Sequence, residues 1–256
     1  MKNIQKMNDN LQLSAEYVII LSVDFFLCRN FPAERILMKK ITIITGHYGS
    51  GKTNLAVNLA VQASREGKAV AVVDLDIVNP YFRTADFREL FAEKNIKLIA
   101  PDFANSNLDI PSIQFDLEQI AKSEDCLIID VGGDDAGAVA LGRYAEALTA
   151  YGNDVDMFYV INQRRYLTAT PDETISLMYD IENASRMKHT AIVNNTNLGK
   201  ETTVDIVENS AEFASEISMR TGLPVAFTAF PEECAELTDN PDAYPVKIYV
   251  KPLWEL

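Results

Sequence analysis

The segment that decides the fold is residues 41–67, ITIITGHYGSGKTNLAVNLAVQASREG, in a chain of 256 residues. Ile41–Thr45 is a short run of mostly β-branched residues, which predicts a buried strand. Gly46–Thr53 follows with three glycines. The stretch after Lys52 has helical periodicity and ends at Gly67. The segment therefore predicts a strand, a tight glycine-rich loop and a helix in direct succession.

The loop matches the pattern G-x-x-x-x-G-K-[ST] at every position. Its glycines let backbone N–H groups turn inward around phosphate, and the following helix N-terminus adds partial positive charge. Lys52 would reach the β- and γ-phosphates, and the Thr53 hydroxyl would ligate Mg²⁺. A chance glycine-rich turn is the alternative, and the flanking strand and helix argue against it. Residues expected to contact the nucleotide here are Gly46, His47, Tyr48, Gly49, Ser50, Gly51, Lys52, Thr53 and Asn54.

Apolar strand-like runs alternate with helical patterns along the rest of the chain. This predicts a doubly wound α/β domain with a mostly parallel sheet between two helical layers, spanning Met38–Leu256. Its ligand site should lie at the carboxyl ends of the strands. The further predicted strands are Ala69–Leu75, Ile96–Ala100, Leu127–Val131, Met157–Ile161, Thr190–Asn194, Val225–Phe230 and Val246–Val250. The further predicted helices are Arg83–Lys94, Ile113–Lys122, Ala136–Ala150, Asp172–Met187 and Glu208–Thr221.

Carboxylates end two of the predicted strands beside the loop. Asp74 and Asp76 close the second strand, and Asp130 closes the Leu127–Val131 strand. An aspartate in the position of Asp130 is the Walker B arrangement, which holds Mg²⁺ through water. Asp76 is the stronger candidate of the other two, and Asp74 has a structural role as its alternative. The glycines in Val131–Asp135 predict a loop that responds to the γ-phosphate.

The order of phosphate loop, D-x-D and D-x-x-G resembles the MinD/ParA/CobQ group of nucleotide-binding proteins, over nearly all of Met38–Leu256. The same class of P-loop NTPases includes nitrogenase iron protein and dethiobiotin synthetase. The resemblance implies that Asp76 positions the attacking water or the metal shell, and that Asp130 is the Walker B acid. It also implies that Asn194 contacts the base. Asp134 is a second candidate for orienting water.

The loop departs from this resemblance at two positions. MinD and ParA proteins carry a second lysine near the start of the loop, and that lysine reaches across a dimer to the partner's nucleotide. This chain has His47 there, followed by Tyr48 where glycine is usual. A neutral imidazole does not replace a permanent charge. A homodimer is still possible for this chain. We do not expect it to be the face-to-face dimer in which a lysine of each subunit reaches the partner's nucleotide.

ATP is the expected nucleotide. Guanine selectivity in related GTPases needs N-K-x-D, whereas Asn194–Asn197 reads N-N-T-N and ends in an amide. An asparagine can hydrogen-bond an adenine edge. Pro231, within Phe230–Glu232, is expected to flank the base, with a strand-end turn as the alternative. The loop also resembles those of nickel-chaperone GTPases, but their metal-binding His/Cys motifs and N-K-x-D are missing.

Charge and cysteine content restrict the partners and the compartment. A formal charge of −14 argues against broad binding to nucleic acid or anionic lipid. The three cysteines have no metal-ligand or redox spacing, which favours the cytoplasm. The apolar run in residues 17–28 is too short to span a bilayer. Residues 1–37 are expected to be an extension ahead of a true start at Met38, with a docking segment as the alternative.

Taken together, these patterns predict a slow Mg²⁺-dependent ATPase that acts as a nucleotide switch for an unknown protein partner. Lys52 would neutralise developing charge, and Asp76 or Asp134 would orient water. An ATP-dependent ligase or kinase acting on a small acid is the main alternative, with Arg164 and Arg165 binding that substrate. These arginines have a surface role as their own alternative. A scaffold that holds ATP without hydrolysis is a third possibility.

Overall fold

The computed structural model describes residues 38–76, 83–100, 115–133 and 135–250. The chain divides into two units, Met1–Leu37 and Met38–Leu256, and all of the first unit lies outside the described residues. The predictions for residues 1–37 therefore stay predictions. Asp134 and part of the predicted helix Ile113–Lys122 also lie outside the described residues.

Within the described residues the strands form one parallel sheet in the order β3-β2-β4-β1-β5-β6-β7-β8. This confirms the predicted α/β fold. The phosphate-loop strand β1 lies centrally, between β4 and β5, so residues from both neighbours meet at its carboxyl end. The strands are β1 (Ile41–Thr45), β2 (Val70–Leu75), β3 (Lys97–Ile99), β4 (Cys126–Val131), β5 (Val155–Ile161), β6 (Ala191–Asn194), β7 (Val225–Pro231) and β8 (Ala243–Val246).

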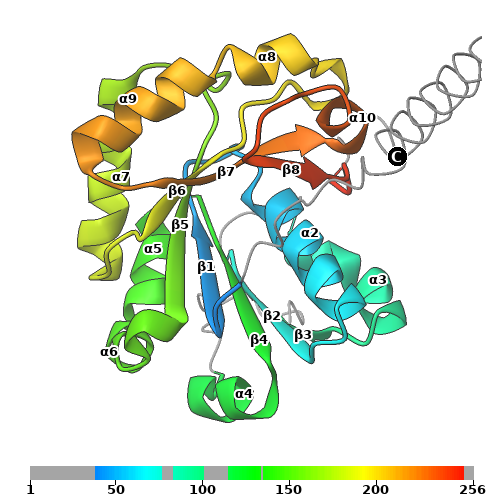
Figure 1. Cartoon of the computed structure of the whole chain (residues 1–256). Coiled ribbons are helices and arrows are strands. Elements are labelled where there is room, and N and C mark those ends of the chain that lie inside the picture. Colours follow the sequence, from blue (N-terminus) through cyan, green and yellow to red (C-terminus); the bar gives the residue numbers. More distant parts are fainter. Residues whose placement is uncertain (1–37, 77–82, 101–114, 134, 251–256) are drawn as a thin grey trace, which may run out of the picture. The chain divides into compact units, whose positions relative to one another are not determined.

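Helices cover both faces of this sheet (Figure 1). In the figure α2 and α3 lie on one side, and α5, α6 and α7 lie on the other. The helices are α2 (Lys52–Arg65), α3 (Arg88–Glu93), α4 (Leu117–Ser123), α5 (Asp135–Gly142), α6 (Ala145–Thr149), α7 (Pro171–Ser185), α8 (Val204–Glu208), α9 (Ala211–Thr221) and α10 (Glu232–Ala235). Short 3-10 turns occupy η1 (Thr84–Phe87), η2 (Gly152–Asp154) and η3 (Gly199–Glu201).

The central strands are buried on both faces, as their unbroken apolar sequences predict. Every residue of β1, β2 and β4 is buried. Leu141 of α5 and Leu148 of α6 pack with one face of these strands in a single apolar cluster, while Leu55 and Leu59 of α2 are buried as well. The core therefore fixes both ends of the phosphate loop, one on β1 and one on α2.

Two predicted helices differ from the structure in their bounds. The predicted helix over 136–150 becomes α5 and α6: Arg143 N and Tyr144 N donate to carbonyl oxygens three residues back, and the Gly142 carbonyl accepts from the Arg186 side chain. The predicted helix over 208–221 is α9, which begins at Ala211, and its predicted first residue, Glu208, ends α8. Ser210 Oγ donates 2.6 Å to Val207 O and accepts 2.8 Å from Asn194 Nδ2, which ties the break between α8 and α9 to the end of β6.

The predicted strand over 246–250 is wrong, because β8 ends at Val246. Beyond that point the backbone bonds to side chains of α2 instead of a neighbouring strand. Lys247 N donates to Asn58 Oδ1 at 2.8 Å, and Tyr249 N donates to Asn54 Oδ1 at 2.8 Å. The start of the helix predicted over 83–94 is also different, since η1 precedes α3.

None of the helices in the described ranges is long and apolar enough to cross a membrane.

Candidate functional site

The phosphate loop runs from the end of β1 to the start of α2. Gly46 and Gly51 have φ values of 145° and 92°, a backbone region that favours glycine. Neither position has space for a side chain: a Cβ at Gly46 would clash with the Val160 carbonyl oxygen, and one at Gly51 with Asn195 Nδ2. The predicted need for glycine is therefore met by both conformation and packing.

Lys52 opens α2 with its side chain largely covered. It is 7% exposed, and its Nζ donates to the His47 carbonyl oxygen at 3.1 Å. Ser50 N donates to that same oxygen at 3.2 Å, so the loop closes on itself around one carbonyl. The ammonium group thus lies beside the loop backbone, where a phosphate oxygen can accept hydrogen bonds from it.

Asp130, at the end of β4, faces the first turn of α2. Its Oδ2 accepts from Thr53 Oγ1 at 2.8 Å and also from Thr84 Oγ1. Burial, followed by the nearby charge of Asp74, raises the pKa of the Asp130 carboxyl to about 7. The group is only 1% exposed, so bulk water does little to stabilise its ionised form.

This arrangement fits a divalent cation. Asp130 Oδ1 and Ser50 Oγ are buried and have no hydrogen-bond partner among the described residues. Carboxylate and hydroxyl oxygens are the donors that Mg²⁺ prefers. Thr53, which is hydrogen-bonded to Asp130 Oδ2, and Asp130 are the residues that would hold Mg²⁺, and Asp130 Oδ1 is the carboxylate oxygen available to it or to its water.

Asp74 has a structural role, as its alternative interpretation expected. It lies opposite Asp130 in the β2–β4 register and is fully buried. Its carboxylate pairs with the Arg83 guanidinium at 3.2 Å and accepts from the backbone N–H groups of Asp76 and Ala85 at 3.0 Å. Burial still raises its pKa, against the lowering effect of Arg83. These bonds anchor the start of η1 beside the site.

Asp76 directly follows β2 and lines the cavity described below. A Cβ at Gly132 would lie 3.2 Å from Asp76 Oδ1, so the loop after β4 passes close to this carboxylate. Its predicted roles in positioning water or Mg²⁺ stay predictions, as does the role of Asp134.

On the base side, the structure replaces Asn194 with its neighbours. Asn194 is fully buried, and its side chain bonds to Ser210 Oγ at 2.8 Å and to Thr196 Oγ1 at 2.9 Å. Its amide is therefore used inside the fold and does not line the cavity. Asn195 and Asn197 line it instead. The predicted strand end at Asn194 is correct, and the cavity-lining asparagines follow it.

Asn195 also connects the base side to the phosphate loop. Its Nδ2 donates to Ser50 O at 2.7 Å, and its own carbonyl accepts from Asn197 Nδ2 at 2.6 Å. Asn197 Oδ1 in turn accepts from Gly199 N at 3.2 Å. The loop after β6 is thereby held in one position relative to the phosphate loop.

Asn54 faces the cavity, but its side chain is used to hold the chain beyond β8. Its Nδ2 donates to Lys247 O at 3.1 Å, and its Oδ1 accepts from Tyr249 N and Val250 N at 2.8 and 3.2 Å. Asn58, one turn later, also donates to Lys247 O. The sequence patterns named Asn54 as a nucleotide contact, which stays a prediction, and did not single out Asn58, although their spacing of four residues places both on one helix face.

His47 and Tyr48 form the outer part of the loop. Burial, and then the Lys52 charge, lower the pKa of His47, so its imidazole is neutral at neutral pH. Tyr48 is 57% exposed at the edge of the cavity. The position of the second lysine is therefore occupied by an uncharged group.

These parts enclose one cavity of about 740 Å³, within the roughly 300–1,000 Å³ of small-molecule sites. Pro231 lines it, and its predicted contact with a base stays a prediction. The apolar wall beyond β8 was not expected. The lining residues are Tyr48, Gly49, Gly51, Lys52, Thr53, Asn54, Asp76, Arg165, Asn195, Asn197, Leu198, Gly199, Lys200, Glu201, Thr202, Ala229, Pro231, Val246, Ile248 and Val250.

The phosphate loop and the strands around it also match a known family of nucleotide-binding domains. Residues 41–212 match the family model of the CobQ/CobB/MinD/ParA nucleotide binding domain, which is more than half of the chain. The chain belongs to this family. The family match includes the whole phosphate loop, Asp76, Asp130 and the loop after β6, and membership supports nucleotide binding by this chain. No curated protein sequence matches the chain significantly.

Solved structures with a similar fold include bacterial FtsY proteins. FtsY from Mycoplasma mycoides is 16% identical with a TM-score of 0.54, covering 81% of this chain and 67% of that one. The Thermotoga maritima protein is 17% identical with a TM-score of 0.56, covering 79% and 65%. FtsY from Elizabethkingia anophelis, solved with GDP, is 16% identical with a TM-score of 0.53, covering 75% and 57%. The chain thus spans about two thirds or less of their length, and the likeness shows the fold of a P-loop NTPase.

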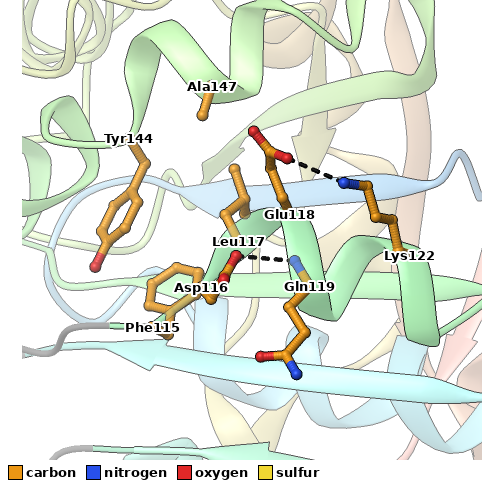
Figure 2. A pocket seen from close by; sticks show the side chains of 8 residues that line it. All are labelled: Phe115, Asp116, Leu117, Glu118, Gln119, Lys122, Tyr144 and Ala147. Atoms are coloured by element: carbon orange, nitrogen blue, oxygen red, sulfur yellow. Dashed lines mark hydrogen bonds and ion pairs between the residues drawn. The ribbon is translucent and has the colours of Figure 1, made fainter.

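A second hollow, of about 590 Å³, lies where α4 begins (Figure 2). The Phe115 ring stacks on Tyr144 with centroids 4.3 Å apart, and Asp116 caps α4 by accepting from Gln119 N at 2.9 Å. Glu118 and Lys122 form a surface pair at 3.0 Å. Each polar group that Figure 2 joins by a dashed line already has a local structural role, and we assign no ligand to this hollow.

Gly133 offers a test of the contact between the loop after β4 and the phosphate loop. A Cβ there would lie 2.7 Å from Tyr48 N and 2.9 Å from Lys52 Nζ. We expect Gly133→Ala to weaken ATP binding about tenfold by displacing the phosphate loop, measured by calorimetry. Gly67→Ala is the control: its φ of 82° predicts a loss of about 1 kcal/mol in stability, but its Cβ would contact nothing. Equal ATP affinities for both variants would contradict the expectation.

Proposed function

We propose that this chain is a Mg²⁺-dependent ATPase of the CobQ/CobB/MinD/ParA family whose slow hydrolysis switches the binding of a protein partner. The observation that carries the proposal is the contact between Thr53 and Asp130 at the phosphate loop, with Asp130 Oδ1 buried and left without a partner among the described residues. Burial makes the ionised form of the Asp130 carboxylate unfavourable in the free protein. Such a position fits a group whose role is to bind a cation together with the nucleotide.

Adenine is the proposed base. Asn195 and Asn197 line the cavity, and each amide has a second N–H beyond the one bonded to Ser50 O or Asn195 O. An amide can both donate and accept at an adenine edge. Pro231, Ile248 and Val250 supply apolar surface for a base. Glu201, which also lines the cavity, is the group that would accept from guanine if GTP were preferred.

Hydrolysis requires a water molecule placed in line with the γ-phosphorus. Its oxygen attacks, the bond to the β–γ bridging oxygen breaks, and ADP and inorganic phosphate leave. Asp76 is proposed to orient that water by accepting a hydrogen bond, and Lys52 to donate to the γ-phosphate oxygens. Charge neutralisation of the β- and γ-phosphate oxygens is the chemistry that Mg²⁺ supplies when bound.

The switch is proposed to be the loop after β4. Gly133 lies against Tyr48 and Lys52 with no space for even one methyl group. A γ-phosphate that draws Lys52 toward itself would therefore move this loop, and loss of the phosphate would release it.

The neutral His47 supports a mechanism without a lysine bridge to a second copy. The buried free thiols of Cys126 and Cys234 support a cytoplasmic location.

Nucleotide titration tests this proposal. Purified protein should bind ATP at least tenfold more tightly than GTP when both are measured at about 5 mM Mg²⁺. It should release phosphate slowly, with ADP as the other product. Preference for GTP that is lost in Glu201→Gln would overturn the adenine assignment. Transfer of the phosphate to a metabolite instead of water would favour a kinase or ligase.

A further inference from the structure

The segment that follows β5 is a tightly bonded turn carrying two adjacent arginines. Asn162 Oδ1 accepts from Arg164 N at 2.9 Å, and Thr168 Oγ1 donates to Asn162 O at 2.9 Å. Leu167 has a φ of 69°, a conformation that a non-glycine residue adopts only when its surroundings impose it. Residues 162–168 therefore form a fixed platform rather than a free surface loop.

This platform is bonded to the nucleotide site on its other side. Gln163 N donates to Thr196 Oγ1 at 3.2 Å, and Asn197 N donates to Asn162 Oδ1 at 3.4 Å. The loop after β6 is itself held to the phosphate loop by the bond from Asn195 to Ser50. The backbone of Arg165 is consequently positioned relative to the phosphates that the loop would bind.

The Arg165 side chain extends along the phosphate loop. A Cβ at Gly49 would lie 3.7 Å from both Cδ and Nε of Arg165. The side chain lines the same cavity as Lys52 and Thr53. Its Nε is buried and has no hydrogen-bond partner among the described residues.

The lack of a counter-charge is informative in so acidic a protein. The chain has a formal charge of −14, yet no ion pair to Arg165 occurs in the part of the chain that the structure describes. A partly desolvated guanidinium without an anion is costly, and a bound anion would remove that cost. Its planar set of donors matches phosphate oxygens. Gly49, which it flanks, belongs to the loop that encloses phosphate.

We propose that Arg165 donates hydrogen bonds to the phosphate chain of the nucleotide bound in its own subunit. This deepens the proposed function and rests on it. Arg165 would then be a second positively charged side chain, after Lys52, at the phosphates of the same subunit. The second lysine of MinD and ParA proteins is replaced here by the neutral His47. Arg164, adjacent in sequence and exposed, does not line the cavity and has no such role.

The test compares Arg165→Ala, Arg165→Lys and the matched control Arg164→Ala by calorimetry with ATP, ADP and adenosine, using full-length protein with Mg²⁺. Arg165→Ala should weaken ATP binding at least tenfold and leave adenosine binding unchanged, since adenosine carries no phosphate. Arg165→Lys should recover part of the loss, because it restores charge without the planar set of donors. Arg164→Ala should bind ATP within twofold of the wild type.

Two outcomes separate this inference from the proposed function. If Arg165→Ala binds ATP like the wild type while Lys52→Ala does not, the inference is overturned and the proposed function stands. If Lys52→Ala also binds normally, the proposed function fails. Equal weakening for ATP and adenosine would assign Arg165 a structural role and overturn the inference. Thermal unfolding without nucleotide checks each variant, and the ATP and adenosine affinities of Arg165→Lys decide the inference if Arg165→Ala does not fold.

Discussion

Lys52→Ala will weaken ATP binding by at least about a hundredfold, equivalent to roughly 2.7 kcal/mol. The Lys52 ammonium is almost fully covered at the mouth of the phosphate loop, where it donates to the His47 carbonyl oxygen. A phosphate oxygen offers it a charge-assisted hydrogen bond, about twice as strong as a neutral one. Titration calorimetry with ATP and Mg²⁺ measures the loss.

Lys122→Ala is the matched control for this change. Lys122 also pairs with an oxygen at 3.0 Å, but its partner is Glu118 on the exposed surface of α4. It should bind ATP as the wild type does. Both variants should unfold within a few degrees of the wild type when nucleotide is absent. ATP binding that survives in Lys52→Ala would show that the phosphate loop is not the binding site.

Asp130→Asn should have opposite effects on function and stability. The amide can still accept from Thr53 and Thr84, but it has no charge to offer Mg²⁺, so the enhancement of ATP binding by Mg²⁺ should disappear. Without nucleotide, the variant should be more stable than the wild type at pH 8. The reason is that it removes a carboxylate that burial and the neighbouring Asp74 destabilise.

The pH dependence of this gain follows from the pKa of Asp130. That pKa is about 7 in the folded protein and 3.8 ordinarily, so between these values the folded state binds more protons than the unfolded state. The stability of the wild type therefore falls, through this group, as pH rises from about 4 to about 7. The advantage of Asp130→Asn should shrink from pH 8 to pH 5 in thermal unfolding.

Asp172→Asn, at an exposed pair with Arg220, is the control for the removal of one carboxylate. It should leave the Mg²⁺ effect on ATP binding unchanged. An Asp130→Asn protein that is less stable than the wild type at pH 8 would contradict the explanation given for the raised pKa.

Several misplaced elements share a physical cause. The helix predicted over 136–150 is divided where α7 packs against Gly142, and that contact comes from a segment more than forty residues away. The strand predicted over 246–250 has an apolar sequence, but asparagines on α2 bind its backbone. Sequence periodicity describes what a segment prefers locally, and long-range contacts override it here.

The phosphate loop, the parallel sheet and the strand-end position of Asp130 could all be predicted from sequence, because each depends on local patterns of residues. Glycine spacing, buried β-branched runs and a carboxylate at a strand end lie within short segments. The sequence ranked Asp76 above Asp74 as a site residue but could not assign the role of either. The role of Asp74 depends on its ion pair with Arg83, which lies outside the local D-x-D pattern.

The tertiary structure alone decided which neighbours share the site. Asn195 rather than Asn194 lines the cavity because Asn194, the last residue of β6, bonds to Ser210 inside the fold, whereas Asn195 follows the strand and bonds to Ser50 O of the phosphate loop. Arg165 lies beside Gly49 because β5 is adjacent to β1 in the sheet, an order that no local pattern in the sequence records. Sequence determined the chemistry of the phosphate loop, and strand order determined what surrounds it.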